Sequence, residues 1–279
     1  MKLRALFAAA LIGGGLLSLP TTAAHAGTIT VKGSDTMVIL GQRWAEEYMK
    51  KNPATVIQVT GGGSGTGISA LINGTTDICA SSRAMKPAEK EKLRDRYNNT
   101  GIEMAVARDG LAVYVNSSSP LTELSMDQLK GIYTGKVTNW KEVGGPDAKI
   151  IVYSRENSSG TYVFFKEQVL GGADFTARAQ TMPGTAAVVN AVAKEKFGIG
   201  YGGAAYAKGI KVLKIKKDDK AAGIAPDDKT IKDGSYPLSR PLFFYTRTGA
   251  SADIKAFTDY VLSGEGQGIA TKVGYFPIK

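Results

Sequence analysis

Apolar and polar positions alternate along the chain in blocks that predict strands, each followed by a polar turn and a helix. Residues 28–31 alternate as a half-buried strand does, and Met37, Leu40, Trp44 and Tyr48 then recur at helical spacing. The same order is repeated twice, with strands at 55–60 and 77–80 and helices at 68–72 and 87–97. This repetition is typical of an α/β sheet with helices on its faces.

Two further strands are predicted at 102–106 and 110–115, after which the polar segment 116–120 breaks the pattern. Residues 216–232 are polar and irregular, so we expect them on the surface. Beyond the break we expect strands at 149–153, 198–201 and 242–246, helices at 129–133, 162–170 and 185–194, and a final helix capped by Ser251.

The break divides the chain most simply into two α/β lobes. We place lobe 1 at residues 27–112 and 240–279, because the final helix is expected to return to it, and lobe 2 at residues 113–239. Ligands in open α/β sheets bind beyond the carboxyl ends of the strands. Four polar turns lie at such ends, so two lobes can bring them together over one cleft.

The first 26 residues predict a secretory signal peptide. Lys2 and Arg4 precede the apolar run 5–19, and Ala24-His25-Ala26 supplies small residues for cleavage before Gly27. Cleavage after Ala26 predicts an exported, periplasmic protein of about 250 residues. It also lowers the formal charge from +10 to +8, which suits an anionic partner, although the basic residues are scattered among acids. No arginine-rich stripe with interleaved aromatics occurs, so we expect no nucleic-acid partner.

Two residue counts exclude common catalytic chemistry. The only histidine, His25, lies in the predicted signal peptide, and the only cysteine, Cys79, lies in an apolar run. Serine–histidine triads, cysteine–histidine pairs and the usual zinc sites are therefore excluded, and no internal disulfide can form. Hydrolysis by carboxylates stays open.

The most informative turn is Ser154-Arg155-Glu156-Asn157-Ser158-Ser159-Gly160-Thr161, which joins a strand to a helix. The first N–H groups of a helix lack internal partners and lie at the positive end of its dipole, so the turn favours an anion. Arg155 adds a planar set of donors that fits a tetrahedral oxyanion. The alternative is an ordinary helix start, with Ser158 or Ser159 as the N-cap and Arg155 on the surface.

A glycine turn, residues 61–67, has related chemistry. Residues 62–69 fit the spacing of a phosphate-binding NTPase loop except that Ile68 stands where lysine is required, and the match to a dinucleotide fingerprint is weak. An exported protein meets little ATP or nicotinamide cofactor, so we reject both and expect no cofactor. The small residues still let backbone donors approach an anion, and Ser64 is expected to cap the next helix with its hydroxyl outward.

The two remaining turns contain Ser34-Asp35-Thr36 and Ser81-Ser82-Arg83. A carboxylate repels an oxyanion, so Asp35 either caps its helix or accepts the proton of an anion such as hydrogen phosphate. The second role would reject sulfate, which has no proton to donate at neutral pH. For Ser82 and Arg83 the alternative is a polar loop with a solvent-facing arginine.

Together these segments resemble the phosphate-binding proteins of bacterial ABC-type phosphate importers. The resemblance covers essentially the whole chain after residue 26, and Arg155-x-x-x-Ser159-Gly160-Thr161 is its most specific part. It implies a two-lobed periplasmic-binding fold of type II, in which each lobe is a mixed sheet flanked by helices and two crossing strands join the lobes. The segments that carry it are 33–36, 61–67, 77–83, 155–161 and 236–242.

The resemblance also implies which residues bind phosphate. Many relatives have an aspartate where Ser82 stands, which receives the proton of hydrogen phosphate, and some have an acid at Asn157 that holds the arginine. We hypothesise that Asp35 takes the proton-accepting role here or that Arg83 changes the local charge balance. The implied contacts are Ser34, Thr36, Ser64, Ser82, Arg155, Ser159, Gly160 and Thr161, to which we add Asp35 and Arg83 as candidates.

The expected function is that of a monomeric periplasmic receptor for inorganic phosphate with no reaction of its own. It would close its lobes and dock on an inner-membrane permease driven by a cytoplasmic ATPase. The alternatives are a receptor for another oxyanion such as sulfate, molybdate or a phosphonate, an exported phosphatase, and an adhesin or signalling protein on the same fold.

Overall fold

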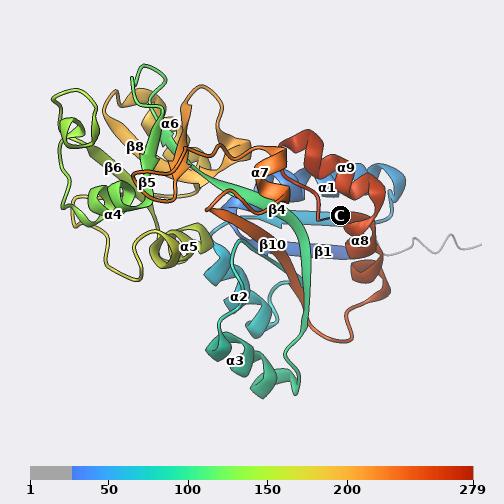
Figure 1. Ribbon diagram of the computed structural model, residues 1–279. Helices are drawn as coiled ribbons and strands as arrows, with labels where there is room; N and C mark the ends of the chain where they lie inside the picture. The colour runs from blue at the N-terminus through green and yellow to red at the C-terminus, as the bar shows by residue number, and fades with distance from the viewer. Residues whose placement is uncertain (1–26, 279) are drawn as a thin grey trace, which may run out of the picture.

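A computed structural model describes residues 27–278, so the predicted signal peptide lies outside the described residues. The strands form one mixed sheet that extends through two α/β units, and helices flank the sheet in each unit (Figure 1). Within residues 27–278 no helix is both long and apolar enough to cross a bilayer. The strand order along the main path is β2-β1-β3-β10-β4-β8-β6-β7, with β9 pairing β4 and β5 beside it.

The first unit is built on three parallel strands. β1 (Thr28–Gly33) lies between β2 (Val56–Thr60) and β3 (Ile78–Ser81), and the parallel order follows from the helices that cross between them. The helices of this unit are α1 (Val38–Lys51), α2 (Ser64–Asn73), α3 (Pro87–Tyr97), α8 (Ala252–Leu262) and α9 (Gly264–Val273).

The second unit has its own strands and helices, and 3-10 turns lie in both units. Its strands are β5 (Glu123–Ser125), β6 (Ile151–Arg155), β7 (Gln180–Met182), β8 (Gly198–Gly203) and β9 (Lys211–Lys216), and its helices are α4 (Met126–Thr134), α5 (Gly160–Gln168), α6 (Thr185–Lys194) and α7 (Asp228–Lys232). The 3-10 turns are η1 (Asp35–Met37), η2 (Trp140–Val143) and η3 (Ala204–Tyr206).

Two long strands connect the units. β4 (Ile102–Val115) pairs with β10 (Ser239–Thr246) along residues 102–110, and then with β8 along residues 111–115. Both strands therefore pass from one unit into the other, and Figure 1 shows them crossing the centre of the molecule. Leu242 and Phe243 of β10 pair with Ala107 and Ala105 of β4, so Val106 is an extra residue that forms a bulge in β4 near the crossing.

Each unit buries a separate hydrophobic core. One core draws on residues 29–107 and 242–275 and includes Trp44, whose ring meets Phe244 edge to face. The other draws on residues 111–238 and includes Tyr201, which stacks on Phe165. Because α8 and α9 pack on α1, the end of the chain closes the core that the first residues begin.

The structure confirms the α/β class and corrects several predicted elements. The two strands expected at 102–106 and 110–115 are one strand, because Asp109 is buried against an arginine of β10 and so does not end it. Ser251 does cap a helix, but α9 follows that helix, so it is not the final one. The segment expected to be irregular contains α7, and β5, β7 and β9 were not predicted.

Candidate anion-binding site

Arg155 lies at the end of β6 with 2% of its surface exposed. Its Nη1 donates to Thr185 Oγ1 at 3.0 Å, and its Nη2 lies 2.6 Å from Asp35 Oδ2 in the other unit. Its Nε is buried and has no hydrogen-bond partner among the described residues. A buried guanidinium with an unpaired Nε–H offers a strong donor to an oxyanion. The alternative prediction, that Arg155 lies on the surface, is therefore wrong.

The first turn of α5 supplies backbone donors beside Arg155. Ser159 is the N-cap, and its Oγ accepts a hydrogen bond from the Tyr162 N–H at 3.2 Å. The N–H groups of Gly160 and Thr161 have no hydrogen bond to any described residue. They lie at the positive end of the helix dipole, so an anion placed here is stabilised by both effects.

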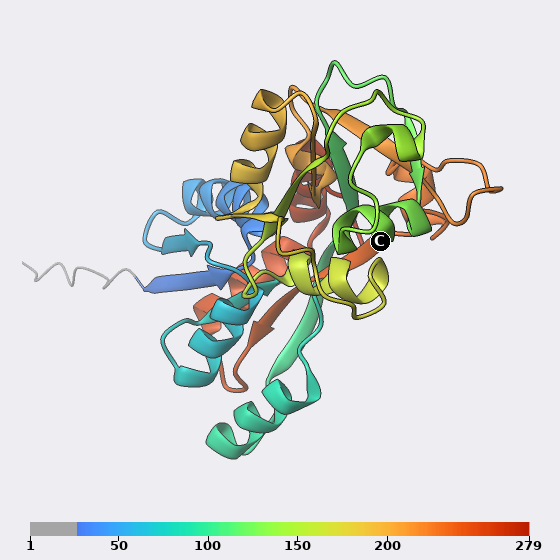
Figure 2. The ribbon, with the colours of Figure 1, turned by 90° about the vertical axis from the view of Figure 1, so that its left-hand side faces the viewer.

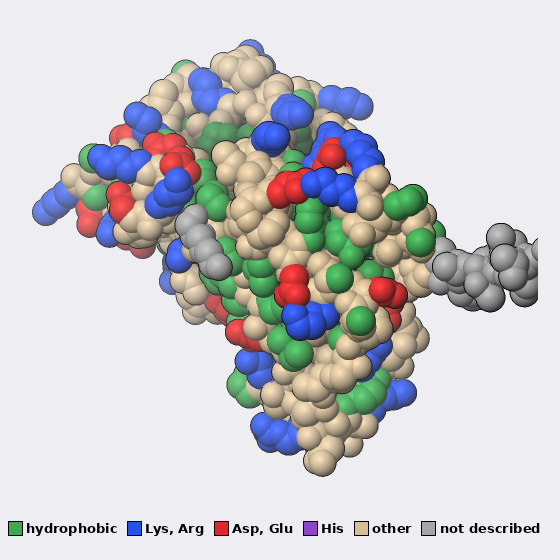
Figure 3. All heavy atoms as spheres, turned by 90° about the vertical axis from the view of Figure 1, so that its right-hand side faces the viewer, with side chains coloured by type: hydrophobic (Ala, Val, Ile, Leu, Met, Phe, Trp, Pro, Cys, Tyr) green, Lys and Arg blue, Asp and Glu red, His purple; other side chains and the backbone are tan. Residues whose placement is uncertain are grey.

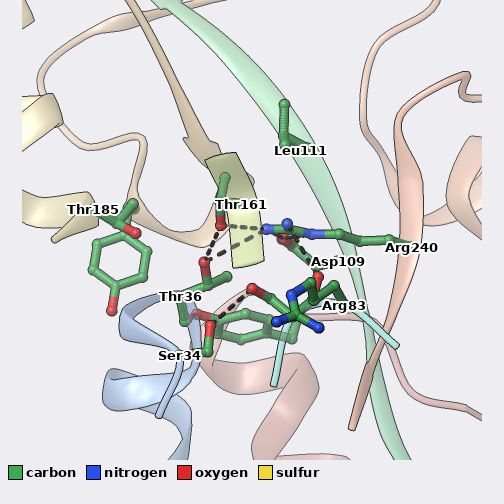
Figure 4. A network of polar contacts seen from close by, with 12 residues as sticks. Ser34, Thr36, Arg83, Asp109, Leu111, Thr161, Thr185 and Arg240 are labelled. Atoms are coloured by element: carbon green, nitrogen blue, oxygen red, sulfur yellow. Dashed lines mark hydrogen bonds and ion pairs between the residues drawn. The ribbon is translucent and has the colours of Figure 1, made fainter. Parts of the chain in front are cut away.

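Hydroxyl groups from both units meet at the same place. Thr36 and Thr161 share a hydrogen bond of 2.8 Å, and the close view shows these two side chains turned toward each other (Figure 4). Ser34 donates to Ser82 Oγ at 2.9 Å. Ser64 Oγ accepts from the Ser82 N–H at 3.0 Å. All five side chains are buried, so these hydroxyls are withdrawn from bulk water.

Gly160 lets the two units approach this closely. A Cβ at this position would lie 2.3 Å from Ser64 Oγ and 2.8 Å from Ser82 Oγ, so any side chain would push the hydroxyls away. Nearby, the N–H of Gly65 donates to the carbonyl of Ser158 at 2.9 Å, which joins the two units directly. α5 lies beside α2 in both Figure 1 and Figure 2, in agreement with these contacts.

Asp35 does not cap a helix. Ser34 is the N-cap of η1 and makes no side-chain capping bond, whereas Asp35 lies inside that turn. Both carboxylate oxygens face other groups: Oδ1 accepts from the Gly62 N–H at 2.9 Å and Oδ2 pairs with Arg155. The N-cap role is therefore wrong, and Asp35 holds the arginine, whereas Asn157 is exposed and forms no hydrogen bond with it.

Two further predicted roles change. The N-cap of α2 is Gly63, with a φ of 94°, so Ser64 is the first helical residue and its hydroxyl is free to face the turn. Arg83 is not solvent-facing, because Nη1 and Nη2 each donate to a carboxylate oxygen of Glu89 at 2.7 Å, and its Nε is buried with no hydrogen-bond partner among the described residues. The candidate role of Arg83 in binding phosphate therefore stays a prediction.

The sequence reading missed a buried ion pair. Asp109 on β4 faces Arg240 on β10 in register, and each is 1–2% exposed. Arg240 Nε and Nη2 donate to Asp109 Oδ2 at 3.0 and 2.8 Å, and Nη2 also donates to Thr161 Oγ1 at 3.1 Å. In Figure 4 the pair lies directly against the two threonines. The available signal was one acidic and one basic residue, Asp109 and Arg240, each followed directly by a mostly apolar stretch of its strand.

Tyr206 is a second missed residue. Its hydroxyl, on η3, donates to the carbonyl of Asp35 at 2.7 Å and so fixes η1 from the other unit. Burial raises the pKa of Tyr206 to about 12, so the phenol stays protonated and remains a donor at neutral pH.

The arrangement can bind an anion without reacting with it. The positive charges of Arg155 and Arg240 are balanced by Asp35 and Asp109, and unpaired N–H donors remain after that balance. Within residues 27–278 no cluster of three or more His, Cys, Asp or Glu side chains could hold a metal. The site therefore supplies hydrogen bonds and fixed dipoles in a dehydrated setting.

Comparisons with known proteins agree with this reading. Residues 19–265 match the PBP superfamily domain. "Phosphate-binding protein PstS" of Staphylococcus haemolyticus is 38% identical over 254 residues, covering 88% of this chain and 79% of the relative. The protein of that name in Pseudomonas aeruginosa is 33% identical over 269 residues, covering 90% and 83%. The chain therefore belongs to the PBP superfamily and, within it, to the family of PstS phosphate-binding proteins.

A solved structure extends the likeness to the fold. It is described as a putative phosphate ABC transporter substrate-binding protein with bound phosphate from Clostridium perfringens. It superposes with a TM-score of 0.83 at 30% identity, over 91% of this chain and all of the other. An ABC-type phosphate transport receptor from Vibrio cholerae superposes with a TM-score of 0.71 at 31% identity, over 89% and 99%. The two-lobed type II fold with two crossing strands is thus confirmed.

Proposed function

We propose that the protein is a periplasmic receptor that captures inorganic phosphate between its lobes and delivers it to an ABC-type permease in the inner membrane. The observation that carries this is the buried Nε of Arg155, which has no partner among the described residues and lies beside the unpaired N–H groups of α5. A tetrahedral anion satisfies these donors at once. The PstS relatives support phosphate as that anion.

The lobes follow from the two cores. We propose that residues 27–112 and 240–279 form lobe 1 and residues 113–239 form lobe 2, with β4 and β10 as the hinge. Direct contacts between Asp35 and Arg155, and between Thr36 and Thr161, describe a closed state. Phosphate binding would favour closure because its oxygens would accept hydrogen bonds from donors of both lobes at once.

Ligand roles follow from the geometry. Arg155 and the N–H groups of Gly160 and Thr161 would donate to phosphate oxygens, because none of these donors is fully used within the protein. The hydroxyls of Ser34, Thr36, Ser64, Ser82 and Ser159 would complete the shell, since a hydroxyl can exchange its present partner for the ligand. Asp35 would orient Arg155 without touching the anion.

Selectivity against sulfate needs a group that accepts the proton of hydrogen phosphate. We propose Asp109 for that role in place of Asp35. The Asp35 oxygens are both engaged, whereas Asp109 Oδ1 has no hydrogen bond to any described residue. A buried carboxylate repels an unprotonated oxyanion but accepts the proton of hydrogen phosphate. This assigns sulfate rejection to the hinge strand β4.

Calorimetric titration of the processed protein with phosphate tests the function, with Arg155→Lys as the variant. The wild type should bind in the micromolar range or tighter, and Arg155→Lys should weaken binding by about 100-fold, since a lysine cannot reproduce the donor geometry. Absence of binding at millimolar phosphate would rule the function out.

Competition between sulfate and phosphate for binding to Asp109→Asn tests the selectivity. An unchanged preference for phosphate would show that Asp109 does not reject sulfate.

The relatives are binding proteins, and we propose that this chain likewise has no reaction of its own. Chromogenic phosphate esters should not turn over, and activity lost in Arg155→Ala would revive the phosphatase alternative. We also propose that the protein is exported by a signal peptide cleaved after Ala26. It would act as a monomer that docks on a permease with a cytoplasmic ATPase, and it would need no cofactor.

We propose no nucleic-acid partner. Basic and acidic side chains are interspersed on the face in Figure 3, and such a surface does not favour binding of a polyanion.

A further inference from the structure

The first described residue is held in the fold at a defined place. The carbonyl of Gly27 accepts a hydrogen bond from the Val56 N–H at 3.1 Å, so residue 27 is already aligned with β2. A Cβ built at Gly27 would lie 2.9 Å from Asp253 Oδ2. The backbone of Gly27 therefore lies against a carboxylate in the first turn of α8, and Figure 1 shows the start of β1 beside that helix.

This carboxylate lacks a partner among residues 27–278. Asp253 forms no ion pair and accepts no hydrogen bond from a described side chain or backbone group. It lines a small cavity of about 260 Å³ together with Gly27, Asp77 and Arg247. Asp77 is already satisfied, because it accepts from the N–H and hydroxyl of Thr30 and lies 3.7 Å from Arg247.

The charges around the cavity therefore do not balance. Arg247 is directed to Asp77 and donates through Nη1 to the carbonyl of Thr76 at 2.6 Å, so it does not serve Asp253. One negative charge is left over, at a place that the backbone of Gly27 already touches. A cation on the nitrogen of Gly27 would neutralise this charge.

We propose that this cavity is the binding site for the new N-terminus of the processed chain. Hydrolysis adds water across the Ala26–Gly27 peptide bond, leaving a carboxylate on Ala26 and an amine on Gly27. An α-amino group has an ordinary pKa of about 7.7–8.0, so it is mostly protonated at neutral pH. The ammonium of Gly27 then pairs with Asp253. The inference rests on the proposed cleavage site.

Processing thereby adds an ion pair that the precursor cannot form. Before cleavage the nitrogen of Gly27 is a neutral amide, and after cleavage it is charged and ties β1 to α8. The effect on stability is modest because Gly27 and Asp253 are both exposed. This stabilising effect occurs, however, only in a chain that begins at residue 27.

Two forms of the protein test the proposal: one beginning at Gly27, and one extended by Ala24-His25-Ala26, which moves the ammonium three residues away. Asp253→Asn should lower the Tm by about 1–3 °C more in the first form than in the second, because loss of the carboxylate from the first turn of α8 affects both forms equally. Asp259→Asn is the matched control, because Asp259 lies on the same helix and pairs with Lys255 at 2.6 Å. It should shift both forms equally.

An equal effect of Asp253→Asn in the two forms would overturn the proposal, as would mass spectrometry showing that the exported protein begins at a residue other than Gly27. Phosphate titration separates this result from the proposed function. Asp253 forms no hydrogen bond or ion pair with the proposed ligand donors, so every form should bind phosphate as the wild type does. A wild type that fails to bind phosphate but still shows the Asp253 coupling would count against phosphate capture alone.

Discussion

Asp109 and Arg240 face each other in register across the two strands that connect the lobes, and their side chains are joined at 2.8 and 3.0 Å. Arg240 also reaches Thr161 in lobe 2 and the carbonyl of Ser82 in lobe 1. The Cζ atom of Arg240 lies over the Phe164 ring, 5.3 Å from its centre. One side chain thus connects the hinge, both lobes and the hydroxyls of the site.

Removing one partner of this pair should destabilise the fold strongly. Arg240→Met leaves the Asp109 charge buried without compensation, and we expect a loss of about 3–5 kcal/mol in the free energy of unfolding measured with urea. The double variant Asp109→Leu with Arg240→Met should recover most of this loss, because no unpaired charge remains. If the double variant is as unstable as the single one, the pair does not act as a unit.

Gly160→Ala should abolish tight binding while leaving the fold intact. The added methyl group would overlap Ser64 Oγ and Ser82 Oγ, so the lobes could not close to the observed distance. We expect at least about a 100-fold loss of phosphate affinity, close to 2.8 kcal/mol.

Gly264→Ala is the matched control for Gly160→Ala. Gly264 is likewise the first residue of a helix after a serine N-cap, and a Cβ there meets nothing within 4 Å. Its phosphate affinity should equal that of the wild type. Equal affinities for Gly160→Ala and the wild type in titration calorimetry would show that the closed geometry is not required.

The Arg83–Glu89 pair should contribute stability that depends on pH. Burial alone would raise the pKa of Glu89, but hydrogen bonds from Arg83 and the Lys86 N–H, with the charge of Arg83, hold it below its usual 4.5. Because the folded pKa is lowered, the contribution is full above pH 4.5 and is lost as pH falls through the lower folded value. Thermal melts between pH 3 and 6 should therefore show a steeper loss for the wild type than for Glu89→Gln.

Cys79 should be inert in the folded protein. The thiol is fully buried, and burial raises its pKa well above the usual range, so almost no thiolate is present at pH 8. Iodoacetamide should label it only after denaturation in urea, and phosphate should slow labelling at intermediate urea because it stabilises the native state. Rapid labelling of the native protein would contradict the buried position.

The sequence alone determined the α/β class, most of the helices and the position of the donors. The apolar spacing at Met37, Leu40, Trp44 and Tyr48 predicted a helix that the structure places at Val38–Lys51. Ser159 was one of two predicted N-caps and is the one used. These features are local: periodicity and capping act over a few residues, so a single segment carries enough information to specify them.

Only the tertiary structure decided which charges meet. Asp35 lies 120 residues from Arg155, and Asp109 lies 131 residues from Arg240, so no local pattern indicates either pair. Their partners depend on how β4 and β10 cross and how closely the lobes approach. The cost of burying an unpaired charge explains why two strands were predicted, at 102–106 and 110–115, whereas the folded chain continues through Asp109 because Arg240 pairs with it.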